Sequence, residues 1–281
     1  MKTFNLLLVL SMTFLLAGCK YDFTRLGEDL GTAKTALFGV SSEEEQEIGH
    51  EAAATLLGAS PLLAHEPTQR YVNRVGQWVA LQSARPDLSW RFAVIDNPNI
   101  NAFAAPDGYV FVTTGLLQQI HSESELAGVL GHEIAHVVEK HHLEALESGA
   151  RLSLAGRVAE ETLRDRGKDV GKYAWVIEGT KKLYTQGLGR DDELSADRLG
   201  VVLAARAGYE PYGLVAVLQR LDALAGKSSE LALLFKTHPA PSDRLEHILG
   251  RIPSSWTRLE GNPDGEDRFR SAMLAWVQAG G

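Results

Sequence analysis

The stretch Gly131-His132-Glu133-Ile134-Ala135-His136-Val137 decides the fold of this chain of 281 residues. It lies within a pattern of apolar residues at every third or fourth position, which predicts one helix from residue 122 to about residue 146. Residues four apart are offset by only about 40° around a helix axis. The imidazoles of His132 and His136 are therefore expected to share one face, where both can bind a single metal ion.

Glu133 follows the first histidine directly, and from there its carboxylate can reach a water molecule on such an ion. Two histidine ligands and a glutamate general base in this spacing are typical of zinc proteases. The bare pattern arises by chance fairly often, but here a capping box of Ser122 and Glu125 begins an amphipathic helix around it. The alternative is a pair of structural histidines that flank a surface glutamate.

A catalytic zinc site needs a third protein ligand and leaves a fourth position open. His142 is one candidate, ten residues after the first histidine. Glu139 and Lys140 favour a helix that continues through this point. On such a helix His141 and His142 would face away from the metal, so we expect neither of them to be a ligand.

The other candidate for the third ligand is Glu193, in the segment Asp192-Glu193-Leu194-Ser195-Ala196-Asp197. This segment opens a further helix that we expect from about residue 191 to residue 207. Glu193 and Asp197 are four apart and share a face, so one carboxylate can bind the metal while the other accepts the free N–H of a ligating histidine. The alternative is a solvated acidic helix start, because acids are favoured in the first turn of any helix.

The two motifs together resemble metallopeptidase family 48, the gluzincins that include HtpX and the CAAX prenyl proteases. Three further stretches match that family in the same order along the chain: Asn101–Ala104, Gly108–Leu117, and Thr237–Pro239 with Arg244. The resemblance covers about residues 41–251. It implies a zincin-like domain with one Zn²⁺ per chain, whose ligands are His132, His136 and Glu193. It also implies that Glu133 is the catalytic base and that Asp197 orients a ligand.

The membrane-embedded members of that family have transmembrane helices around the catalytic helix, whereas this chain has charged amphipathic stretches at about 150–166 and 168–187. The chain therefore resembles the secreted, soluble branch. We predict an α+β, mainly helical fold with a small β-sheet beside the catalytic helix. The sheet is expected to contain strands at 90–95, 102–104 and 108–114. The other helices are expected at 42–60, 67–84, 211–225, 242–251 and 266–278.

Two regions outside the metal motifs are candidates for contact with a substrate. The stretch Asn101, Ala102, Phe103 and Ala104 is expected to form an exposed edge strand that binds an extended polypeptide through main-chain hydrogen bonds. An ordinary loop is the alternative.

The prolines after His238 predict an exposed, semi-rigid loop. His238 is assigned a catalytic role or that of a latch on the open metal position, with a simple helix-capping loop as the alternative. Arg244 is expected to stabilise negative charge in the transition state or to pair with a site carboxylate.

The first residues resemble a bacterial lipoprotein signal, because a short apolar run from Phe4 ends in Leu16-Ala17-Gly18-Cys19. We predict cleavage after residue 18, a lipid on Cys19, and Lys20 as a residue that favours the outer membrane. The predicted divisions are a signal peptide at 1–18, a tether at 19–40, a peptidase domain at 41–252 and a helical extension at 253–281.

Composition narrows the function further. Lys and Arg number 28 against 36 Asp and Glu, a net charge of −8, which argues against nucleic acid as a partner. The single cysteine excludes an internal disulfide and an all-thiolate metal site.

These observations predict a lipid-anchored zinc metalloendopeptidase that faces the periplasm and hydrolyses misfolded or unassembled envelope proteins. Two alternatives stay open. The first is a latched protease that acts mainly as a chaperone-like assembly factor for outer-membrane components. The second is a zinc-stabilised structural lipoprotein without catalysis.

Overall fold

The computed structural model describes residues 40–160, 174–253, 256, 259 and 264–278, and for residues 151–160 it describes the backbone alone. Cys19 and the rest of the predicted tether up to residue 39 lie outside the described residues, and the predicted domain divisions stay predictions. The helices are, in chain order, α2 Ser42–Ala59, α3 Glu66–Ala80, α4 Thr114–Leu117, α5 Glu123–Val138, α6 His141–Glu160, α7 Ala174–Gln186, α8 Arg190–Arg206, α9 Gly213–Leu224, α10 Leu234–Thr237, α11 Pro241–Leu249 and α12 Glu266–Gln278. None of these helices is both long and apolar enough to cross a membrane.

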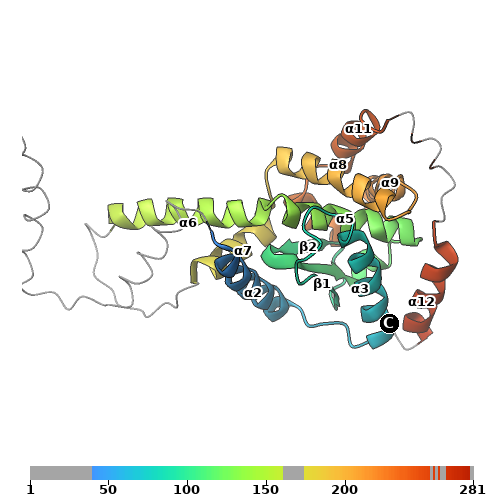
Figure 1. Cartoon of the computed structure of the whole chain (residues 1–281), viewed down its shortest axis with the longest axis horizontal. Helices are drawn as coiled ribbons and strands as arrows, with labels where there is room; N and C mark the ends of the chain where they lie inside the picture. The colour runs from blue at the N-terminus through green and yellow to red at the C-terminus, as the bar shows by residue number, and fades with distance from the viewer. Residues whose placement is uncertain (1–39, 161–173, 254–255, 257–258, 260–263, 279–281) are drawn as a thin grey trace, which may run out of the picture.

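A three-stranded sheet lies beside α5 (Figure 1). Its strands are β1 (Arg91–Ile95), β2 (Ala102–Ala105) and β3 (Tyr109–Thr113), in the order β1-β3-β2. β1 pairs parallel with β3, and β2 pairs antiparallel with it, so that β2 is an edge strand. The prediction of an α+β, mainly helical fold with a small sheet beside the motif helix is confirmed.

The sheet separates two hydrophobic clusters, because side chains alternate between its faces along each strand. On β3, Val110 and Val112 pack into the cluster that includes α3, α5 and α9. Phe111 packs on the other side, against α2, α6 and α7. Each face of the sheet is thus covered by helices, and all four residues of β2 are buried.

Two glycines allow α5 and α8 to lie in close contact. A Cβ atom added to Gly131 would lie 2.7 Å from the carbonyl oxygen of Gly200, and one added to Gly200 would lie 2.6 Å from the backbone nitrogen of His132. Real Cβ atoms do not come this close to backbone atoms, so only glycine fits at both positions. This close approach brings the N-terminal part of α8, with the carboxylates of Glu193 and Asp197, against the histidine face of α5.

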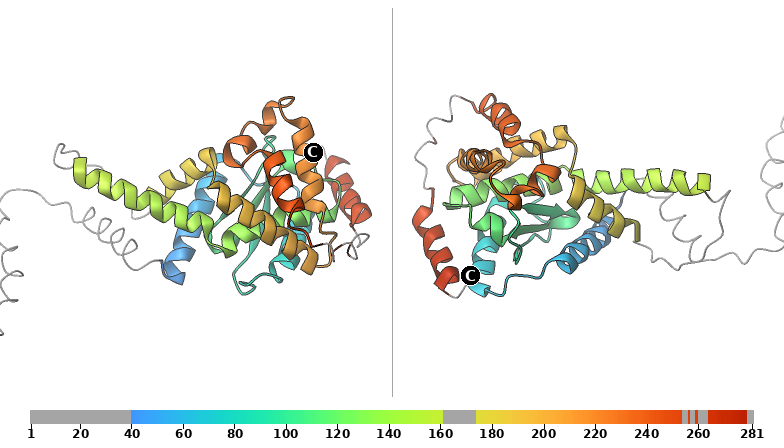
Figure 2. Two further views of the ribbon diagram at one scale, coloured as in Figure 1. Left: turned by 90° about the horizontal axis from the view of Figure 1, so that it is seen from above. Right: turned by 180° about the vertical axis from the view of Figure 1, so that it is seen from behind.

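The prediction of one continuous helix from residue 122 to residue 146 is wrong. α5 ends at Val138, Lys140 adopts a left-handed φ of 61°, and a new helix begins at His141. The stretch predicted to begin near residue 150 does not start a new helix, since α6 runs without a break through that position. Figure 2 shows from two further sides that α6 then extends away from the rest of the described chain.

Tertiary contacts explain the break at Lys140. Its Nζ lies 2.9 Å from Oε2 of Glu45, a buried carboxylate on α2. Arg85 binds the other oxygen of Glu45 at 2.7 Å and donates to the carbonyl oxygen of Val137 at 3.2 Å. A left-handed lysine costs on the order of 1–3 kcal/mol. The charged contacts with the buried carboxylate of Glu45 counteract that cost, and helix propensity alone does not report them.

Smaller differences concern the ends of elements. The capping box of α2 is formed by Ser41 and Glu44, whereas the sequence pattern predicts Ser42 and Glu45, one residue later. The second helix ends at Ala80 rather than at residue 84, and the last helix agrees with its prediction at both ends. Of the predicted stretches at 150–166 and 168–187, residues 161–173 lie outside the described chain.

Candidate metal centre

Three side-chain groups from two helices converge on one buried point. On α5, Nε2 of His132 and Nε2 of His136 lie 3.1 Å apart. Glu193, in the first turn of α8, places its two carboxylate oxygens 3.6 Å from the first nitrogen and 3.5 Å from the second. All three residues are at most 3% exposed. The helical spacing of the histidines and the close approach of α8 together produce this cluster.

The cluster fits a tetrahedral metal ion. Nitrogen and oxygen ligands about 2.0–2.2 Å from Zn²⁺ in tetrahedral geometry lie about 3.4 Å from one another. The three separations here are close to that value. Oε2 of Glu193 is buried and has no hydrogen-bond partner among the described residues. A buried carboxylate oxygen without a partner is costly unless a cation neutralises it, and two imidazoles with one carboxylate are a donor set that suits zinc.

Asp197 holds the first of the two histidines. Its Oδ1 lies 2.9 Å from Nδ1 of His132, so that the N–H of this nitrogen donates to the carboxylate. The lone pair of the other ring nitrogen, Nε2, is then directed at the cluster. Burial alone would raise the pKa of Asp197, but the charge of Arg244 and hydrogen bonds from both neighbours outweigh it and hold the pKa well below its usual range.

Arg244 pairs with the same aspartate in a bidentate arrangement. Its Nε donates to Oδ2 at 2.9 Å and its Nη2 donates to Oδ1 at 2.6 Å. Nη2 also lies 3.3 Å from Nδ1 of His132. Arg244 does not line the pocket that contains Glu133 and His238. The geometry therefore fits the pairing with a site carboxylate, one of the two roles expected for Arg244, better than direct contact with a substrate.

Glu133 lies on the same helix as the two histidines and lines a small pocket beside the cluster. Burial raises the pKa of its carboxyl to about 7, and the negative charges of Glu193 and Asp197 add to this effect. A general base is most effective when its pKa lies near the working pH. Glu133 is thus suited to exchange protons with a group in the pocket.

His238 lies at the edge of this cluster. Its Nε2 is 3.8 Å from Oε2 of Glu193, and its ring centroid is 5.7 Å from that of His132. Nδ1 lies 2.9 Å from the hydroxyl oxygen of Thr237. The expectation of a loop is confirmed, since His238 is extended between α10 and α11, but its side chain is only 11% exposed and points into the site. Burial lowers the pKa of His238 to about 4, which leaves the imidazole neutral at pH 7.

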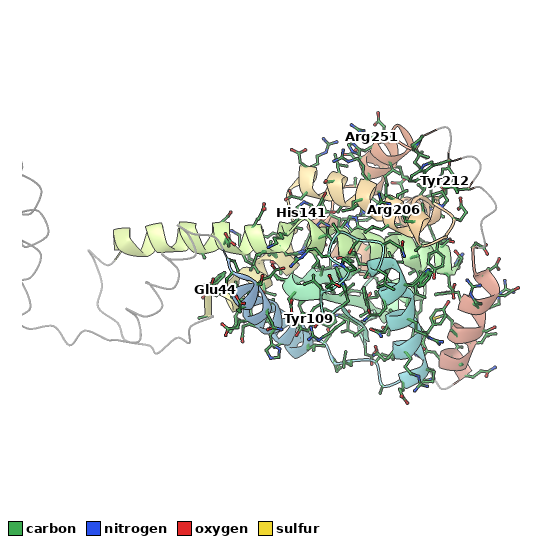
Figure 3. All side chains as sticks on the ribbon, in the orientation of Figure 1. Glu44, Tyr109, His141, Arg206, Tyr212 and Arg251 are labelled. Atoms are coloured by element: carbon green, nitrogen blue, oxygen red, sulfur yellow. The ribbon has the colours of Figure 1, made fainter. Side chains whose placement is uncertain are left out.

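The break at Lys140 also changes where the next two histidines lie. Sequence reasoning predicts that both face away, and this is wrong. Nδ1 of His141 lies 3.0 Å from Nδ1 of His136, and the ring centroid of His142 lies 5.2 Å from that of His136. Figure 3 labels His141 at the start of α6. Two groups of three potential ligands converge among the described residues, His132 with His136 and Glu193, and His132 with Glu133 and His238. Neither His141 nor His142 belongs to either group.

The candidate substrate strand borders the same pocket. Residues 102–105 of β2 line it together with Glu133, His142 and His238. Asn101 lies directly before the strand, and its Nδ2 donates to the hydroxyl of Thr237 at 3.4 Å. The strand lies at an edge of the sheet as predicted, but it is not exposed. Tyr184 of α7 covers it, with its ring centroid 4.6 Å from that of Phe103.

Comparison with known proteins gives a consistent picture. The sequence model described as "Peptidase family M48" matches residues 66–252, more than half of the chain. The chain is 29% identical over 229 residues to "Beta-barrel assembly-enhancing protease" from Escherichia coli strain K12, a match that covers 79% of this chain and 46% of that protein. It is 27% identical over 257 residues to "Mitochondrial metalloendopeptidase OMA1" from Schizosaccharomyces pombe, covering 86% and 71% of the two chains.

A third relative is "Metalloendopeptidase OMA1, mitochondrial" from Bos taurus, 33% identical over 209 residues, or 69% of this chain and 39% of that one. The chain spans about half the length of the bacterial relatives that it matches. The matched residues include both histidine positions and the α8 carboxylates, so the convergent cluster lies within the family region.

Proposed function

Because the chain belongs to peptidase family M48, we propose that it is a zinc-dependent endopeptidase. The observation that supports this most strongly is the convergence of His132, His136 and Glu193. Two of these residues, His136 and Glu193, line one pocket together with Glu133. The three converging side chains would hold one Zn²⁺ per chain. When bound, zinc supplies Lewis acidity, which polarises a carbonyl group and makes water more acidic.

The residues of the chain supply the proton transfers. The Glu133 carboxylate takes a proton from the attacking water, and its raised pKa then allows it to give this proton to the leaving amine nitrogen. Asp197 accepts the Nδ1–H of His132 and so fixes that ligand's tautomer and orientation. Arg244 acts through Asp197, because its two hydrogen bonds hold the carboxylate in place.

We propose that the substrates are extended segments of misfolded or unassembled envelope polypeptides. β2 borders the pocket, and an edge strand binds an extended chain through main-chain groups with little demand on its sequence. The bacterial relative is named for enhancing β-barrel assembly, which supports a role in the envelope. Tyr184 and the rest of α7 must move for such a chain to reach β2.

We propose in addition that the protein faces the periplasm and is held at the outer membrane by a lipid on Cys19. The segment Leu16-Ala17-Gly18-Cys19 after an apolar run supports this proposal, and Lys20 supports the outer membrane. Metabolic labelling with a radioactive fatty acid is expected to mark the wild-type protein and not the Cys19→Ser variant. Equal labelling of the two proteins would refute the lipid anchor.

The role of Glu133 as the general base is tested by the substitution Glu133→Gln. The amide keeps the size of the side chain but cannot accept the proton, so hydrolysis of casein by the purified protein is expected to fall by about 100- to 10,000-fold. Zinc content should be unchanged, because the three ligands remain.

The matched control for this experiment is Glu144→Gln, which alters an exposed glutamate on α6 and should leave hydrolysis at the wild-type level. Equal activity in wild type and Glu133→Gln, after contaminating proteases have been removed, would show that the proposed mechanism is wrong.

His238 is proposed to be a latch that occupies the open metal position in the resting protein. Its neutral imidazole and its 3.8 Å distance from Glu193 support this role. His238→Ala is then expected to raise basal casein hydrolysis several-fold and to leave zinc bound. A fall in activity with zinc retained would instead assign His238 to transition-state stabilisation. The exposed His121 provides the control variant His121→Ala, which should keep wild-type activity. Unchanged activity in His238→Ala as well would remove both roles.

A further inference from the structure

The second histidine of the motif also has a partner on its outer nitrogen, and this partner is another histidine. Nδ1 of His136 lies 3.0 Å from Nδ1 of His141, and both residues are buried. Two imidazole nitrogens at this distance form a hydrogen bond only if one carries a proton and the other offers a lone pair. The direction of this bond follows from the chemistry on either side of it.

On the side of the cluster, Nε2 of His136 points at Nε2 of His132 and at Glu193. A neutral imidazole that offers its Nε2 lone pair to a cation carries its proton on Nδ1. His136 is therefore the donor. Nδ1 of His141 must then be the acceptor, which puts the proton of His141 on its own Nε2.

On the side of His141 that faces away from the cluster, acidic side chains lie near the Nε2 atom that carries this proton. Nε2 of His141 lies 3.3 Å from Oε2 of Glu139 and 3.8 Å from Oδ1 of Asp192. Oε2 of Glu139 is buried and accepts no hydrogen bond among the described residues, so it is available to the N–H of His141 at this short distance. The two protons between the cluster and the acids can thus be assigned in one direction only. His136 donates its Nδ1 proton to His141, and His141 directs its Nε2 proton at the acids.

The helix break is what makes this contact possible. On a continuous helix His141 would lie five residues beyond His136, and such residues do not face one another. The left-handed conformation of Lys140 turns the chain back, and the buried Glu45 on α2 holds Lys140 in that conformation. The contact is therefore built by tertiary structure on both sides of the break.

We propose that His141 is a positioning residue for the metal centre, which fixes the tautomer and ring orientation of His136 as Asp197 fixes those of His132. This inference rests on the proposed metal centre. His141 itself does not touch the ion or the substrate in this arrangement. Hydrogen-bond partners of metal ligands typically contribute about 10- to 100-fold to metal affinity.

The test compares three substitutions of His141 by metal affinity, measured on the full chain by competition for zinc with a chromophoric chelator. His141→Ala removes the acceptor. His141→Asn keeps one, because its amide oxygen can occupy the position of Nδ1. His141→Gln keeps more bulk but places its amide near the position of Nε2. The control is His121→Ala, which changes an exposed histidine before α5.

We expect the zinc dissociation constant to rise by about 10- to 100-fold in His141→Ala and His141→Gln. It should stay within about threefold of wild type in His141→Asn and in the control. Melting temperatures measured without metal show whether a variant still folds. If His141→Ala does not fold, the comparison of the Asn and Gln variants decides the question alone.

Two results would overturn the inference. Wild-type affinity in His141→Ala or His141→Gln would mean that no acceptor is needed at this position. Equal losses in the Asn and Gln variants would mean that the imidazole contributes packing rather than a hydrogen bond. A wild-type chain that binds no zinc would be a different failure, since it would refute the proposed metal centre and this inference with it.

Discussion

The site depends on one interaction, the contact of the buried Glu193 carboxylate with the two histidines of α5. Its oxygens face two imidazole nitrogens, and one of them has no hydrogen-bond partner among the described residues. Such a charged group is costly in a protein interior unless positive charge is supplied, and a divalent cation between the three side chains would supply it. The contact between Gly131 and Gly200 is needed to bring the carboxylate so close, and Asp197 on the same helix face then reaches His132.

The metal cluster and the pocket have residues in common, because His136 and Glu193 also line the pocket. α5 carries the histidines and Glu133 and packs against β2, so the reacting groups and the strand proposed to bind substrate have a fixed relation. α7 covers that strand through the ring contact of Tyr184 with Phe103. Together with His238 at the cluster, this contact describes a site whose machinery is assembled but whose access is restricted.

Much of this arrangement could be predicted from the sequence, for physical reasons. Local rules place two histidines four apart on one helix face and make Glu193 and Asp197 neighbours on another, and the short strands follow from their alternating pattern. The break at Lys140 could not be predicted in this way. Neither glutamate nor lysine breaks a helix by propensity, and the cause is a buried acid on α2, far away in the sequence. The positions of His141 and His142 follow from that break, so a continuous-helix pattern places both histidines on the wrong side.

The central claim is that His132, His136 and Glu193 together hold one metal ion, and zinc content measures it directly. Elemental analysis of the purified full chain should find about one zinc per wild-type chain and far less in Glu193→Ala. His142→Ala, which alters a histidine outside the converging group, should retain the metal. Full zinc in Glu193→Ala together with loss of zinc in His142→Ala would contradict the account, because the third ligand would then come from α6 and not from α8.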